Sequence, residues 1–99
     1  MKFMVTWNIP QDKWLPIIKK FTALSPQEQK NAGEGATMIG RWHDAAGRKG
    51  FVIFEANSVT PVQRYIGLWN ALCDCEITPV VDDEEATIVY RQIIADNNA

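Results

Sequence analysis

Residues 37–56, TMIGRWHDAAGRKGFVIFEA, hold two stretches typical of β-strands, joined by a short polar loop. Residues 37–43 and 51–56 are rich in β-branched and aromatic residues, which pack well on a pleated sheet. Residues 44–48 between them contain Asp, Gly and Arg and indicate a hairpin loop. This stretch therefore predicts a central antiparallel hairpin, and the rest of the chain is arranged around it.

A strand and a helix are predicted on the N-terminal side of the hairpin. Residues 2–9 alternate between apolar and more polar side chains, which favours a strand, and Pro10 ends it. Asp12 is a suitable cap for the helix that follows. Its apolar stripe has helical spacing and consists of Trp14, Ile17, Ile18, Phe21 and Leu24. We expect Ser25-Pro26 to break this helix and residues 27–35 to form a polar connection.

A helix, a strand and a last helix are predicted on the C-terminal side. Thr60, Pro61 and Gln63 have the pattern of a capping box, which begins a helix with Val62, Tyr65, Ile66, Trp69 and Leu72 on its apolar stripe. Residues 75–81 predict a fourth strand, and Pro79 favours the sheet edge. Asp82 or Asp83 caps a final helix, whose apolar stripe is Ala86, Val89, Tyr90, Ile93 and Ile94.

The predicted order is β-α-β-β-α-β followed by a helix. With right-handed crossovers this order gives an α+β fold of the ferredoxin-like kind, with helices on one face of the sheet. The 99 residues fit a single domain spanning 1–99.

Composition narrows the class of protein further. Hydrophobic residues make up 46% and charged residues 22%, and the net charge is −2, which argues against a disordered chain or a surface for nucleic acid. No apolar run is long enough for a signal peptide or a membrane span, so we expect a cytoplasmic protein without a membrane partner.

Cys73 and Cys75 are expected to be free thiols, because a bridge across one residue adds little stability.

One face of the sheet is left uncovered by the predicted helices. The face toward the helices is expected to hold Phe3, Val5, Trp7, Met38, Trp42, Val52, Phe54, Ile77 and Val81. The open face then holds Met4, Thr6, Asn8, Ile39, Arg41, His43, Phe51, Ile53, Glu55, Glu76, Thr78 and Val80. Its apolar centre suits a partner better than it suits water.

This assignment depends on the register of the hairpin. If His43 pairs with Lys49, Arg41 shares a side with Glu55, and we favour this register because it separates polar from apolar residues. If His43 pairs with Arg48, Arg41 and His43 share a side with Val52, because a slip of one residue exchanges the faces.

The ordered set of motifs resembles the dimeric α+β barrel superfamily. The motifs are residues 2–7 (KFMVTW), 40–44 (GRWHD), 50–55 (GFVIFE) and 78–84 (TPVVDDE). More narrowly, the chain resembles an uncharacterised family of that superfamily, domain of unknown function 3303. The resemblance implies a homodimer in which two sheets pack face to face, with a cavity inside the barrel or beside the sheet.

The candidate catalytic residues are His43, Arg41 and Glu55. His43 is the only histidine and can exchange a proton near neutral pH. Arg41 would orient an anionic oxygen, and Glu55 would pair with either side chain. The alternative is a histidine at a strand end that is hydrogen-bonded to Asp44 or to solvent.

The candidate ligand-binding residues are Thr6, Asn8, Phe51, Trp42 and Trp69, which offer hydrogen bonds and flat aromatic walls. The sequence predicts a homodimer that binds a small molecule in a pocket beside the sheet, without metal or cofactor. Two alternatives stay open. One is a cofactor-independent enzyme, monooxygenase-like or isomerase-like, that transfers a proton on a small carbonyl or phenolic substrate. The other is a structural or regulatory dimer without ligand.

Overall fold

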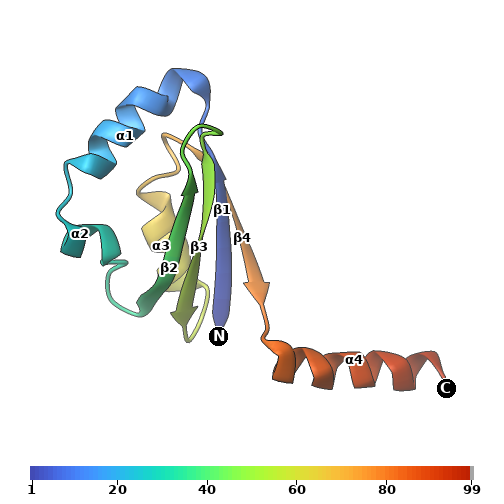
Figure 1. The fold of residues 1–99 in the computed structure, drawn as a ribbon. Helices are drawn as coiled ribbons and strands as arrows, with labels where there is room; N and C mark the ends of the chain where they lie inside the picture. Colours follow the sequence, from blue (N-terminus) through green and yellow to red (C-terminus); the bar gives the residue numbers. More distant parts are fainter. Residues whose placement is uncertain (99) are drawn as a thin grey trace.

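The computed structural model describes residues 1–98 (Figure 1). Its elements follow one another along the chain as β1 (Lys2–Asn8), the 3₁₀ turn η1 (Gln11–Lys13), α1 (Trp14–Thr22), α2 (Pro26–Lys30), β2 (Ala36–Asp44), β3 (Lys49–Ala56), α3 (Thr60–Gly67), β4 (Asp74–Val80) and α4 (Asp83–Asn97). None of the helices formed by residues 1–98 has both the length and the apolar character needed to cross a membrane.

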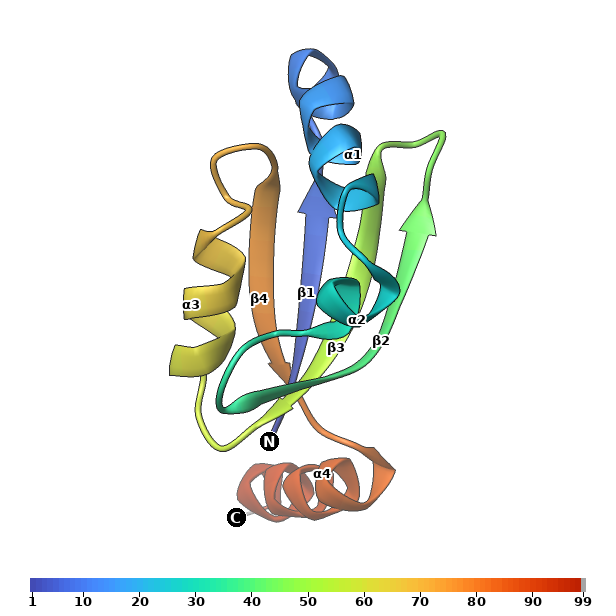
Figure 2. The same ribbon diagram turned by 90° about the vertical axis from the view of Figure 1, so that its left-hand side faces the viewer.

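The four strands form one antiparallel sheet in the order β2-β3-β1-β4. The helices α1, α2 and α3 all lie on one face of this sheet (Figure 2). This arrangement confirms the predicted α+β ferredoxin-like fold, including the edge position of β4.

The core lies between the sheet and the helices α1 and α3. From the sheet it takes alternate residues of β1 and β3, and from α3 it takes one helical stripe. The most fully buried side chains are Phe3, Val5, Phe54 and Val62. The period-two and helical patterns of the sequence predicted these four residues, because burial of one face is what produces both patterns.

The hairpin register favoured from the sequence is wrong. In the structure His43 pairs with Gly50 and Arg41 pairs with Val52, so both side chains lie on the helix-covered face. Asp44 pairs with Lys49, so the loop consists of residues 45–48 and the pairing differs by one residue from the favoured register. In the loop the Asp44 carboxylate accepts a hydrogen bond from the Gly47 N–H at 2.9 Å, and Arg48 adopts a left-handed φ of 56°.

A β-bulge in β2 allows both Met38 and Arg41 to face the helices. Met38 pairs with Phe54 and Gly40 pairs with Ile53, so Ile39 is the extra residue. The bulge reverses the alternation after Met38. Trp42 therefore lies on the open face, where its ring stacks on Phe51 with centroids 5.2 Å apart, and its predicted place toward the helices is wrong.

Three helix starts differ from the prediction. Asp12 lies in η1 and does not cap α1, whose N-cap is Lys13 with no side-chain hydrogen bond. Residues 26–30 form α2 where a polar connection was expected, because Ser25 and Glu28 make a reciprocal capping box and Pro26 is the first helical residue. The predicted box at Thr60 does not form. The N-cap of α3 is Val59, with no side-chain hydrogen bond.

The last helix begins as predicted, with the Asp82 carboxylate accepting a hydrogen bond from the Glu85 N–H at 2.9 Å. It then projects beyond the sheet on the side opposite to α1, α2 and α3 (Figures 1 and 2). None of its residues is buried. Val81 lies after β4 and is 52% exposed, so its predicted place toward the helices is also wrong.

Candidate functional site

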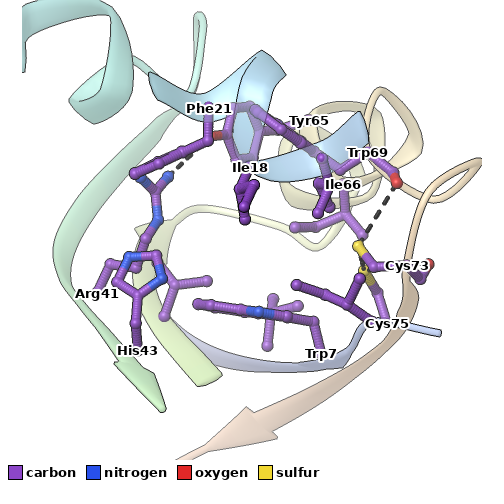
Figure 3. A pocket seen from close by; sticks show the side chains of 14 residues that line it. Trp7, Ile18, Phe21, Arg41, His43, Tyr65, Ile66, Trp69, Cys73 and Cys75 are labelled. Carbon is purple, nitrogen blue, oxygen red and sulfur yellow. Dashed lines mark hydrogen bonds between the residues drawn. The ribbon is translucent and has the colours of Figure 1, made fainter. Parts of the chain in front are cut away.

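A cavity of about 110 Å³ lies between the sheet and the helices α1 and α3 (Figure 3). Each neighbouring element contributes to its wall, which is made of Val5, Trp7, Ile9, Ile17, Ile18, Phe21, Arg41, His43, Val52, Tyr65, Ile66, Trp69, Cys73 and Cys75. Most of these side chains are apolar. A concave, mostly apolar space with a few polar groups is the usual form of a small-molecule site.

The cavity has two different ends. Arg41 and His43 from β2 lie at one end, and Cys73 and Cys75 lie at the other, with the Trp7 ring between them (Figure 3). The short run of alternating residues after the bulge brings both β2 side chains to the cavity. The bulge at Ile39 is therefore the local feature that builds the polar end.

Arg41 is held at the cavity by a hydrogen bond and an aromatic ring. Its guanidinium donates to the Tyr65 hydroxyl at 2.9 Å and lies 5.2 Å from the centre of the Phe21 ring. Arg41 is half-buried, and within residues 1–98 no carboxylate forms an ion pair with it. A partly desolvated cation without a counter-ion favours the binding of an anion.

His43 packs its ring between two aromatic side chains. The ring centroids of Trp7 and Phe21 lie 5.3 Å and 5.2 Å from that of His43. Burial lowers the pKa of His43, and the neighbouring Arg41 charge lowers it further. At neutral pH the imidazole is therefore uncharged and able to accept a proton or a hydrogen bond.

The third candidate catalytic residue, Glu55, lies away from this cavity on the open face. Its carboxylate accepts a hydrogen bond from the N-terminal ammonium of Met1 at 3.0 Å and lies 3.5 Å from Lys2 Nζ. The bond from the terminal ammonium lowers the pKa of Glu55. The expectation that Glu55 pairs with Arg41 or His43 is wrong, because the register places them on opposite faces.

The five candidate ligand-binding residues are divided between the two faces. Trp69 lies in the wall of the cavity. Thr6, Asn8, Trp42 and Phe51 instead surround a more open hollow on the uncovered face of the sheet. The structure therefore separates residues that the sequence grouped into one site.

The sequence reasoning did not single out Tyr65, Phe21 or the two cysteines as site residues. Tyr65 and Phe21 were assigned to apolar helix stripes, which is where they are. A phenolic hydroxyl on a buried stripe needs a hydrogen-bond partner, and this requirement could have indicated a nearby polar group such as Arg41. Within residues 1–98 no three metal-ligating side chains gather into a possible metal site.

The fold and cavity define a small α+β protein of ferredoxin-like topology with an apolar cavity under its helices. A family model described as Domain of unknown function (DUF3303) matches residues 1–94, so the chain belongs to this family, as its motifs predicted. No curated protein matches the chain. The description of the family specifies no activity, and the function is therefore argued from the cavity itself.

Proposed function

We propose that the protein binds a small aromatic carboxylate, or an anion of similar size, in the cavity between the sheet and the helices α1 and α3. The observation that carries this proposal is the half-buried Arg41, which has no acidic partner among residues 1–98 and lies at the rim of an apolar cavity. The anionic group would bind Arg41, and the apolar body would lie against Trp7 and Phe21. Charge-assisted hydrogen bonds to Arg are strong and orient planar anions.

The size of the cavity limits the ligand. Its volume of about 110 Å³ is close to the roughly 150 Å³ of a cavity that holds benzene. It is well below the roughly 300 Å³ at which pockets for drug-sized molecules begin. We therefore infer a ligand with about one ring, rather than a flavin, a haem or a nucleotide.

Benzoate and benzyl alcohol test this proposal, because they share a ring and differ in charge. We expect benzoate to quench the fluorescence of Trp7 and Trp69 and to bind more tightly than benzyl alcohol. Arg41→Gln should raise the Kd for benzoate about tenfold to a hundredfold, since a hydrogen bond to a charged group contributes about 1.5–3 kcal/mol. The Kd for benzyl alcohol should change by less than about threefold.

Arg91→Gln is the matched control, because Arg91 lies on α4, away from the cavity. It should leave both affinities unchanged. If Arg41→Gln binds benzoate as tightly as the parent does, or if neither compound binds the parent, the proposal is wrong. The cavity would then belong to the core of a protein without this ligand.

We also propose that the protein is a homodimer in which two open sheet faces meet. The open face carries an apolar set consisting of Met4, Trp42, Phe51, Ile53 and Val80. Beside it, α4 exposes Ile88, Val89, Tyr90, Ile93 and Ile94, which spread around more than half of the helix. Such a helix needs apolar contacts on more than one side.

A second copy of the chain suits both surfaces. The open face and α4 form a corner on the side without other helices (Figure 1). The helix is about 22 Å long at 1.5 Å per residue, which is enough to lie along a partner seated in this corner. Exchange of α4 between two copies would cover both surfaces at once. Native mass spectrometry of the purified protein tests the dimer, and a monomer would contradict it.

The proposal places this dimer in the cytoplasm. The spacing of Cys73 and Cys75 is compatible with this compartment, because a bridge across one residue adds little stability to the fold and thiols persist in reducing compartments.

A further inference from the structure

The two cysteines of the cavity wall lie closer together than the ligand site requires. Cys73 Sγ and Cys75 Sγ are 3.4 Å apart. Cys73 lies in the bend before β4, and Cys75 is the second residue of that strand. Both thiols line the end of the cavity opposite to Arg41 and His43 (Figure 3). A carboxylate held at Arg41 makes no use of them.

The surroundings of the two thiols differ. Cys73 is 5% exposed, and its thiol lies 3.5 Å from the Trp69 carbonyl oxygen and 3.4 Å from Cys75 Sγ. Cys75 is only partly buried. A small reagent therefore reaches the Cys75 thiol more easily than the buried Cys73 thiol.

The two thiols also differ in acidity. The hydrogen bond between the thiols lowers the pKa of Cys75 and, together with burial, raises the pKa of Cys73. Since the thiolate is the nucleophile, the more accessible sulfur is also the more reactive one. Accessibility and acidity therefore both indicate that Cys75 reacts before Cys73.

We propose that Cys73 and Cys75 form a reversible dithiol–disulfide site that is oxidised by hydrogen peroxide through a sulfenic acid on Cys75. The sulfur atoms must approach from 3.4 Å to about 2.05 Å. Because the two residues are separated only by Asp74, this approach needs a local adjustment of the bend before β4 and no movement of a distant element.

The chemistry balances with peroxide as the oxidant. The Cys75 thiolate attacks one peroxide oxygen, so an S–O bond forms, the O–O bond breaks and hydroxide leaves. The Cys73 sulfur then attacks Cys75 Sγ, so the S–S bond forms, the S–O bond breaks and water leaves with the Cys73 proton. Two thiols and one peroxide give one disulfide and two waters, and a sulfenic acid beside a second thiol reacts in this way.

A bridge between Cys73 and Cys75 would change the redox state of the two thiols and would have little effect on the stability of the fold. A disulfide that closes a loop across one residue removes little entropy from the unfolded chain. Such a bond is expected to be easily reduced, which is typical of labile rather than structural disulfides. The site lies on the helix-covered face, so the proposed dimer leaves it accessible, and the inference does not depend on ligand binding.

Treatment of the whole protein with hydrogen peroxide tests the site. We expect the intact mass to fall by two hydrogens, with the bond mapped between Cys73 and Cys75 and reversed by dithiothreitol. Cys73→Ser should stop at a sulfenic acid on Cys75 that dimedone traps. Cys75→Ser should oxidise more slowly than Cys73→Ser, because the thiol that remains in it, Cys73, is the buried one.

A measurement on the parent protein tests the same order of reactivity without any substitution, so it does not depend on whether the variants fold. Limited alkylation with iodoacetamide should label Cys75 before Cys73 when the labelled peptides are separated by mass. The proposal is overturned if Cys73 is labelled first, or if peroxide adds oxygen without the loss of two hydrogens. It is also overturned if the bridge forms only between two chains.

Discussion

At the scale of single residues, Arg41 and His43 set the chemical character of the cavity. Arg41 is fixed by the Tyr65 hydroxyl and by the Phe21 ring, and it brings a positive charge close to the imidazole of His43. A charge held in this way disfavours a second charge nearby. The result is one permanent cation and one neutral base at the same end of an apolar space.

The lowered pKa of His43 predicts how stability depends on pH. Below its ordinary value of 6.5, the unfolded chain binds a proton that the folded protein resists. The free energy of unfolding should therefore fall as the pH drops below 6.5 toward the lower pKa of the folded protein. Urea unfolding of the parent and of His43→Gln at about pH 7.5 and about pH 5 checks this, since the variant lacks the proton uptake.

The same prediction can be checked directly, because His43 is the only histidine and its NMR signals need no assignment. Its titration midpoint should lie below 6.5 and should rise in Arg41→Gln, which removes the neighbouring charge. A midpoint at or above 6.5 in the parent would mean that the ring is not packed between Trp7 and Phe21 as described.

At the scale of elements, the short helix α2 depends on its first residues. The Glu28 N–H donates to Ser25 Oγ at 3.1 Å, and the Ser25 N–H donates to the Glu28 carboxylate at 2.9 Å. A helix of five residues cannot be stable through its own backbone bonds alone. We therefore regard this reciprocal cap as the main local reason for α2.

Removal of this cap should be measurable. Ser25→Ala should lower the free energy of unfolding by about 1 kcal/mol, the usual effect of losing an N-cap hydroxyl. Urea unfolding followed by circular dichroism gives this value. Ser58→Ala is the control, because Ser58 is exposed in the turn before α3 and should change stability by less than about 0.5 kcal/mol. Equal effects of the two variants would mean that the cap does not hold α2.

At the scale of the whole molecule, the open face and α4 are the surfaces that the single chain leaves without contacts. The principal extents of 55 × 28 × 19 Å reflect a helix that stands away from the body of the protein. A lone domain of this size would gain stability by covering such a helix. The proposed dimer provides the missing contacts.

Ile53→Asp tests the sheet-to-sheet contact. Ile53 lies on the open face opposite Met4 and Gly40, so the substitution would bury an unpaired carboxylate in the proposed interface. The dimer dissociation constant should rise by more than about a hundredfold, since an unpaired buried charge costs about 3–5 kcal/mol. Leu15→Asp, on the exposed outer side of α1, should leave the dimer intact. Light scattering after size exclusion distinguishes the two, and an intact Ile53→Asp dimer would contradict face-to-face packing.

Local sequence patterns were enough to predict the order of the four strands and of α1, α3 and α4, the edge position of β4, the family, and the core residues Phe3, Val5, Phe54 and Val62. These features follow from local patterns, because burial of one face repeats every two residues in a strand and about every 3.6 residues in a helix. Ser25-Pro26 ends α1 as predicted, and the same two residues with Glu28 also begin α2, a capping signal that the sequence contains.

The face of the sheet that carries Arg41 and His43 could not be predicted from local patterns and follows from strand pairing. Their position depends on the four-residue hairpin loop and on the bulge at Ile39, and one residue more or less in either place exchanges the two faces. Gly40 inside the strand pattern is a local signal for a bulge. It does not by itself set the register, because the bulge forms where pairing with β3 favours both Met38 and Arg41 on the core side. The site is therefore a consequence of strand pairing, which depends on contacts between distant parts of the chain.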